Sequence, residues 1–146
     1  MCSGIEYKGR MHLWQDSDVR LPVQMRDGSV SWVKWGERHG IQSPFFQGPC
    51  ARLESVKERK WARFHPRAVK IPMDRYMERD IRSKPYWVKV SEGSVLQGLL
   101  ATWGDEQRVY VVTIETPPEF QHVQPRWPRV FTGMASPQGF EPRLPA

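Results

Sequence analysis

Cysteine, long apolar runs and acidic residues are scarce in this sequence, and each scarcity excludes a class of protein. Only two of the 146 residues are cysteine, Cys2 and Cys50, which is too few for a disulfide framework and gives no CxxC metal pair. The four histidines show no metal-ligand spacing. No apolar run is long enough to span a bilayer, and residues 1–20 lack the apolar stretch of a signal peptide. The sequence therefore predicts a soluble, cytoplasmic protein without a metal or other cofactor.

Acidic residues are also in short supply. The chain carries 22 Lys and Arg against 16 Asp and Glu, a formal net charge of +6. A basic balance attracts polyanions, and the seven tryptophans supply flat faces on which unpaired bases can stack. Single-stranded nucleic acid is the partner that this composition favours. The alternative is that the tryptophans are core residues and the arginines form a solvated face.

The residue patterns predict short strands interrupted once by a helix. Alternating runs at 21–26 and 29–35 flank Asp27-Gly28, a strong signal for a β-hairpin. Ser55 and Glu58 have the spacing of a capping box, which predicts a helix over residues 56–64. Further strands are expected at 5–8, 11–15, 68–72, 74–79, 85–90, 95–103 and around 127–131. The run 108–115 is the most β-like, and its length suggests the centre of a sheet.

These elements predict a β-rich α+β domain over residues 1–132, in the form of a twisted, partly closed barrel of short strands with one main helix. Residues 133–146 are rich in Gly and Pro without periodicity, and are expected to form a loose tail. No internal repeat is evident. We expect a monomer with a single core.

Cys2 has a distinctive chemistry if Met1 is removed, as initiator methionine normally is before a small residue. The terminal Cys2 then carries a thiol and an α-amine on adjacent carbons, and the amine titrates near pH ~8 against ~10.4 for a lysine. Such an aminothiol attacks an aldehyde first through nitrogen and then through sulfur, closing a thiazolidine ring. The alternative is that Cys2 is a small buried hydrophobe near a frayed end.

A series of short motifs occurs in the order that resembles the SOS-response-associated peptidase (SRAP) family. The motifs lie within residues 1–131 and are Met1-Cys2, Trp35-Gly36, Ala51-Arg-Leu-Glu-Ser55, Ile71-Pro-Met-Asp-Arg-Tyr-Met-Glu78, Lys84-Pro-Tyr-Trp87, Leu96-Gln-Gly-Leu99, Val111-Val-Thr-Ile-Glu-Thr116 and Pro125-Arg-Trp-Pro128. The resemblance implies a β-rich fold of its own kind and a covalent trap for abasic sites in single-stranded DNA, part of the response to DNA damage. It also implies self-removal of the leading methionine.

The resemblance implies a role for several residues of this chain. Cys2 matches the nucleophile, and Glu78 matches an acidic proton shuttle, a role that suits a carboxylate beside an aldehyde carbon. His122 lies two positions before the place of the family's histidine; on a strand it would share the same face and could substitute for it, but in a turn it would not.

DNA contacts are implied in the same way. Arg52 stands where the family has a DNA-contacting arginine, whose guanidinium suits a phosphate. Trp35 and Arg126 lie in two of the matching motifs and are expected to join it in binding the strand.

The sequence departs from the family pattern at four places. Before Glu78, Arg75-Tyr76-Met77 replaces the family's Gly-Phe-Tyr. Cys50 stands where the family has an asparagine, and Gln124 where it has the histidine. Ser3 and Gly4 stand where an arginine follows the first cysteine. These changes bear on reversal of the crosslink and on tight binding of DNA, and leave the aminothiol intact.

Three functions are compatible with the sequence. The first is a covalent sensor of abasic sites, which requires Cys2 in an open, positively charged groove with Glu78 beside its sulfur. The second is a module that binds single strands without covalent chemistry. The third is a cysteine-dependent, self-processing peptidase built from Cys2, Glu78 and His122, which requires these groups to lie within about 3 Å or to be bridged by water.

Overall fold

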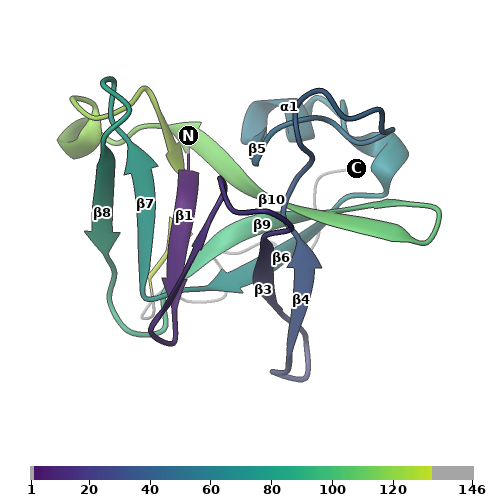
Figure 1. The fold of residues 1–146 in the computed structure, drawn as a ribbon, viewed down its shortest axis with the longest axis horizontal. Helices are drawn as coiled ribbons and strands as arrows, with labels where there is room; N and C mark the ends of the chain where they lie inside the picture. The colour runs from purple at the N-terminus through teal and green to yellow at the C-terminus, as the bar shows by residue number, and fades with distance from the viewer. Residues whose placement is uncertain (1, 133–146) are drawn as a thin grey trace.

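Two β-sheets share a common core in the computed structural model of the chain, which describes residues 2–132 (Figure 1). The smaller sheet has the order β2-β1-β7-β8, and all of its pairs are antiparallel. Its strands are β1 (Cys2–Tyr7), β2 (Arg10–Leu13), β7 (Arg75–Arg79) and β8 (Pro85–Lys89).

The larger sheet has the order β11-β10-β9-β6-β3-β4, with β5 added parallel to β10 and β12 added to β9. Its strands are β3 (Arg20–Gln24), β4 (Val30–Lys34), β5 (Cys50–Arg52), β6 (Arg67–Pro72), β9 (Val95–Trp103), β10 (Glu106–Glu115), β11 (Arg126–Pro128) and β12 (Val130–Phe131). The β-rich α+β class is therefore confirmed. The predicted barrel is not found, because neither sheet closes on itself in residues 2–132. The expected tail, 133–146, lies outside the described residues.

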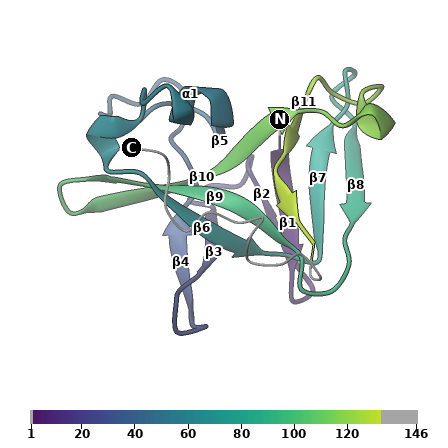
Figure 2. The ribbon, with the colours of Figure 1, turned by 180° about the vertical axis from the view of Figure 1, so that it is seen from behind.

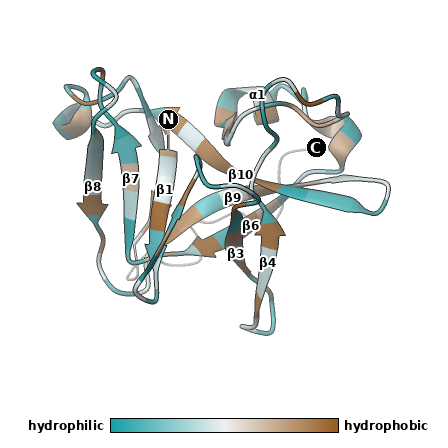
Figure 3. Ribbon diagram, viewed as in Figure 1, coloured by the Kyte–Doolittle hydropathy of each residue, from teal (hydrophilic) through white to brown (hydrophobic). Residues whose placement is uncertain are grey.

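Strand β10 is buried on both faces, which explains its long apolar run. Val109 and Val111 belong to the core between the two sheets, whereas Tyr110 and Val112 point into a second cluster on the opposite face. Figure 2 shows β10 and β9 running from the smaller sheet to the helical side of the molecule, and Figure 3 shows hydrophobic residues along both. A strand covered on both sides reads as continuous apolar sequence. The strand lies inside the sheet, as expected, because β9 and then β11 pair with one of its edges and β5 pairs with the other.

The predicted hairpin is confirmed. Residues of β3 pair with those of β4 from Arg20↔Lys34 to Gln24↔Val30. Gly28 has a φ of +86°, and the Asp27 carboxylate accepts the backbone N–H of Ser29 at 2.9 Å. The local chemistry of the turn therefore sets the register of the strand pair.

The predicted helix is wrong in its position. The helix α1 spans Leu53–Lys57, and after a break a short 3₁₀ turn, η1, spans Ala62–Phe64. Val56, Trp61 and Phe64 are all buried in the second cluster. Val56 and Trp61 would lie about 140° apart on one continuous helix. Interrupting the helix, with Arg59 at a φ of +65°, lets both side chains reach the core.

A second 3₁₀ turn, η2 (Pro118–Phe120), connects β10 to β11. No helix within residues 2–132 has the length and apolar character needed to cross a membrane.

The close packing of Gly36 against the backbone of Gly48 gives a prediction about stability. It has a φ of +52°, and a Cβ at this position would run into the carbonyl oxygen of Gly48. We expect Gly36→Ala to lower the free energy of unfolding by about 3 kcal/mol, since backbone strain and a backbone clash add. Gly104→Ala is the matched control, because its φ is +64° but nothing lies within 4 Å of the added Cβ. Urea denaturation of the two variants measures the difference, and equal losses would contradict the packing of Gly36 against Gly48.

Candidate functional site

A β-bulge places Cys2 directly beside Glu78. From Gly4 to Glu6 the pairing of β1 with β7 is regular, with Gly4 opposite Met77. Continued without change, this register would place Cys2 opposite Arg79. The register shifts between Cys2 and Gly4 instead, so that Cys2 pairs with Glu78. A bulge re-aims a side chain in this way, and it brings together two residues 76 positions apart.

Both groups are buried, which corrects the expectation of an open groove. Cys2 and Glu78 have exposed fractions of 0%. The Cys2 thiol lies in the core between the sheets and donates to the carbonyl oxygen of Gly4 at 3.7 Å. As it stands in the folded chain, the thiol is packed away from solvent.

Burial has a strong effect on the protonation of this pair. It raises the pKa of Glu78 from 4.5 to about 7. It also raises the pKa of the Cys2 thiol well above its usual range, and the negative charge of Glu78 adds to the shift. Near neutral pH the carboxyl group of Glu78 therefore exists in both protonation states, a condition suited to accepting and donating a proton.

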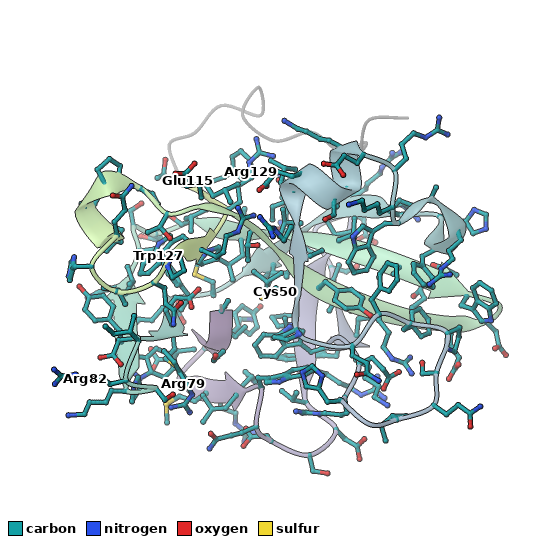
Figure 4. All side chains as sticks on the ribbon, turned by 90° about the horizontal axis from the view of Figure 1, so that it is seen from above. Cys50, Arg79, Arg82, Glu115, Trp127 and Arg129 are labelled. Atoms are coloured by element: carbon teal, nitrogen blue, oxygen red, sulfur yellow. The ribbon has the colours of Figure 1, made fainter. Side chains whose placement is uncertain are left out.

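Cys50, the second cysteine of the chain, contacts the first. Strand β5 begins at Cys50 and pairs in parallel with β10, where Val111 lies opposite Cys50. The Cys50 thiol donates to the carbonyl oxygen of Cys2 at 3.8 Å, and burial raises its pKa to about 12. Figure 4 looks down on this end of the molecule and shows Cys50 near its centre. Cys50 therefore holds the backbone of Cys2 as a hydrogen-bond donor.

Tyr76 and Trp127 form one wall of the site, which the sequence patterns did not indicate. Tyr76 lies two residues before Glu78 on β7, so that both side chains point to the same face of the strand. The Trp127 ring N–H donates to the Tyr76 hydroxyl at 2.7 Å, and the Phe120 ring stacks on Trp127 at 4.6 Å. Aromatic residues from β7, η2 and β11 thus close the site on this side.

Two of the predicted DNA-binding residues share one carboxylate. Arg126 forms a bidentate pair with Glu54, at 2.7 and 3.0 Å, and also donates to the carbonyl oxygen of Thr113. These hydrogen bonds lower the pKa of Glu54 to about 2. The Arg52 side chain lies 3.6 Å from the same carboxylate and is 65% exposed. Arg52 is therefore the more available of the two cations.

Trp35 does not present its ring to solvent, which corrects its expected contact with a base. Its exposed fraction is 1%, and its ring N–H donates to the carbonyl oxygen of Pro49 at 2.9 Å. The ring also packs against Trp14 at 5.5 Å. Trp35 instead holds the backbone immediately before Cys50.

His122 lies at the outer edge of the site rather than inside it. It is exposed in the turn after η2, and its ring meets that of Tyr86 at 6.5 Å. Tyr86 in turn lies opposite Glu78 across the β7–β8 pair. The side chain of Gln124 reaches further in, because its amide donates to the carbonyl oxygen of Arg79, the residue after Glu78. Gln124, and not His122, therefore contacts the strand that carries Glu78.

No group of three or more His, Cys, Asp or Glu side chains suited to a metal ion occurs in the part of the chain that the structure describes. Comparison with models of known families, with characterised proteins and with solved structures gives no match for this chain.

The raised pKa of Glu78 makes a prediction about stability. The folded protein holds this proton up to about pH 7 and the unfolded chain only to about 4.5, so the stabilisation present at low pH is lost between these values. The shift corresponds to about 3 kcal/mol. We expect Glu78→Gln to abolish this pH-dependent loss. The free energy of unfolding of the variant should therefore rise relative to that of the wild type between pH 5 and 8.

Urea unfolding at several pH values measures the difference between wild type and variant. Glu119→Gln, which changes an exposed carboxylate on η2, serves as the control and should follow the wild type. Parallel curves for wild type and Glu78→Gln would show that Glu78 titrates normally.

Proposed function

We propose that this chain is a SRAP-like protein that covalently traps abasic sites in single-stranded DNA through Cys2. The observation that carries the proposal is the pairing of Cys2 with Glu78 across β1 and β7. It brings together the two residues that the family resemblance pairs as nucleophile and proton shuttle. The resemblance and this pairing are independent of each other, because the motifs were matched by their order along the chain alone.

The proposed reaction uses the chain after removal of Met1. The α-amine of Cys2 adds to the aldehyde carbon of the ring-opened sugar, and loss of one water gives an imine. The Cys2 sulfur then adds to the same carbon while the thiol proton passes to nitrogen, which closes the thiazolidine. One water leaves overall, and no oxidant or reductant is consumed.

Glu78 moves the protons in this scheme. The protonated carboxyl group donates to the departing hydroxyl during imine formation, and the carboxylate accepts the thiol proton. A pKa of about 7 allows both steps near neutral pH. Arg52, exposed at the end of β5, supplies a guanidinium for a neighbouring phosphate.

Removal of Met1 is the step that makes the site reactive. While Met1 remains bonded to the Cys2 nitrogen, that nitrogen is an amide and cannot form an imine. The proposed function therefore includes thiol-peptidase self-processing, in which Cys2 and Glu78 assist one water molecule in hydrolysing the peptide bond before Cys2; this releases Met1 as the free amino acid and leaves the α-amine on Cys2. In this scheme the buried thiol of the chain described here belongs to the precursor.

The test is a covalent adduct with DNA. A single-stranded oligonucleotide with one abasic site is incubated with the processed chain, and the mixture is run on a denaturing gel. We expect an adduct that survives denaturation without a reducing agent. Cys2→Ala and a chain that retains a residue before Cys2 should give none.

Glu78→Gln should slow adduct formation by about a hundredfold, a typical contribution of general acid–base catalysis. Glu119→Gln is the matched carboxylate control and should react at the wild-type rate. An adduct that persists in Cys2→Ala would overturn the proposal, as would an equal rate for the two glutamate variants.

A second function, binding of single strands without covalent chemistry, is favoured by one observation. Cys2 is 0% exposed and its thiol pKa is raised, which is typical of a structural cysteine. In that case Cys2→Ala leaves DNA affinity unchanged, affinity falls steeply with salt, and no wild-type adduct appears.

A further inference from the structure

A surface hollow of about 430 Å³ lies beside the candidate site. Its walls come from the segment after β2, the end of β4 and the loop that follows β4. Its polar and charged lining includes Gln15, Asp18, Lys34, Glu37 and Arg38. Lys34 and Arg38 are the two cations of the hollow, and the hydrogen bonds described for the candidate site do not involve them.

One hydrogen bond connects the hollow to β7, at Arg79, whose side chain points to the face of the strand opposite to that of Glu78. The guanidinium of Arg79, the residue after Glu78 on β7, donates to the side-chain oxygen of Gln15 at 2.9 Å. Gln15 lines the hollow. A ligand that lies in the hollow and extends past Gln15 therefore reaches the strand that carries Glu78.

Two like charges face each other at the rim. Lys34 on β4 lies directly opposite Arg20 on β3. Cross-strand neighbours on an antiparallel pair have their Cβ atoms about 5 Å apart, and like charges in such a pair destabilise the sheet. An anion bound between them would remove this cost.

An exposed aromatic platform continues from these cations. Trp32 shares the face of β4 that carries Lys34, and its side chain is 42% exposed. The Trp32 ring meets the His12 ring at 5.0 Å and the Tyr7 ring at 5.9 Å, and the Lys8 ammonium lies 5.4 Å from the centre of the Tyr7 ring. Flat rings interleaved with cations suit unpaired bases and the phosphates that join them.

Acidic groups of the hollow do not cancel this charge. Glu37 is buried and pairs with Arg108 at 3.1 Å, which leaves Asp18 as the exposed carboxylate of the lining. Arg38 lies with its guanidinium 4.0 Å from the centre of the Trp14 ring and donates to the carbonyl oxygen of Asp16. Packing on Trp14 holds this cation in place at the wall.

We propose that the hollow and the Trp32 platform bind the DNA strand next to the damaged nucleotide, with a base stacked on Trp32 and phosphates held by Lys34, Arg38 and Arg20. The inference rests on the proposed function in one respect, since the strand is taken to be the one whose abasic site reaches Cys2. A peptide of acidic residues alone would satisfy the cations but has no rings to stack on Trp32, so the platform favours nucleic acid.

Binding of an undamaged strand tests this surface separately from the chemistry. The affinity of the full chain for a fluorescein-labelled oligothymidylate of roughly 15 nucleotides is measured by anisotropy. We expect Trp32→Ala to weaken binding about tenfold and Trp32→Phe to restore most of it. Lys34→Gln should weaken binding and lower the slope of log K against log salt by about 1.

Trp103→Ala and Lys89→Gln are the matched controls, because both residues are exposed and lie on other parts of the surface. Equal weakening by the two tryptophan variants would overturn the inference. Competition by polyglutamate as effective as that by unlabelled oligothymidylate would overturn it too, since an acidic peptide would then be the better occupant.

The two proposals fail in different ways. If the wild type forms the denaturation-resistant adduct but Trp32→Ala binds the undamaged strand normally, the surface proposal alone is wrong. If Trp32→Ala loses affinity but no adduct forms with the abasic strand, the covalent function alone is wrong.

Discussion

The pairing of β1 with β7 is the interaction on which the candidate site depends. Without the bulge before Gly4, the first strand would place Cys2 opposite Arg79, and the thiol would have a guanidinium rather than a carboxylate as its neighbour. A single extra residue in one strand therefore decides the chemistry of the pair. The same pairing buries both groups, so the position that unites them also raises both of their pKa values.

Strand β10 packs against this small sheet through the core cluster that the two sheets share. Its two buried faces serve two clusters, and its edge receives β5, which brings Cys50 to the backbone of Cys2. Trp35 supports the same arrangement from the other side, since its ring N–H holds the carbonyl oxygen of Pro49. Cys2, Trp35 and Cys50 come from distant parts of the chain. They lie close together because β5 pairs with the long strand β10.

The parts of the structure that could be predicted from sequence are those with local causes. The Asp27-Gly28 turn and the apolar run of β10 carry their own signals in turn chemistry and hydrophobicity. The helix could not be placed, because the need to bury both Val56 and Trp61 overrides the capping box at Ser55. The burial of Trp35 and the contact of Gln124 with β7 depend on long-range packing, which a single sequence does not contain. The closeness of Cys2 to Glu78 was expected only through resemblance; the burial of Cys2 was one of the two interpretations of that residue, whereas the burial of Glu78 was not expected.

Cys2 begins β1, which lies between β2 and β7, and this position affects the rate at which the Cys2 thiol can react. Because β1 is hydrogen-bonded to β2 on one side and to β7 on the other, its backbone cannot peel away as a unit without breaking both ladders. Fraying confined to the first residues costs far less than such an opening. The rate at which any reagent meets the sulfur is then governed by this local opening equilibrium, which the exchange of the β1 amide hydrogens with solvent reports directly.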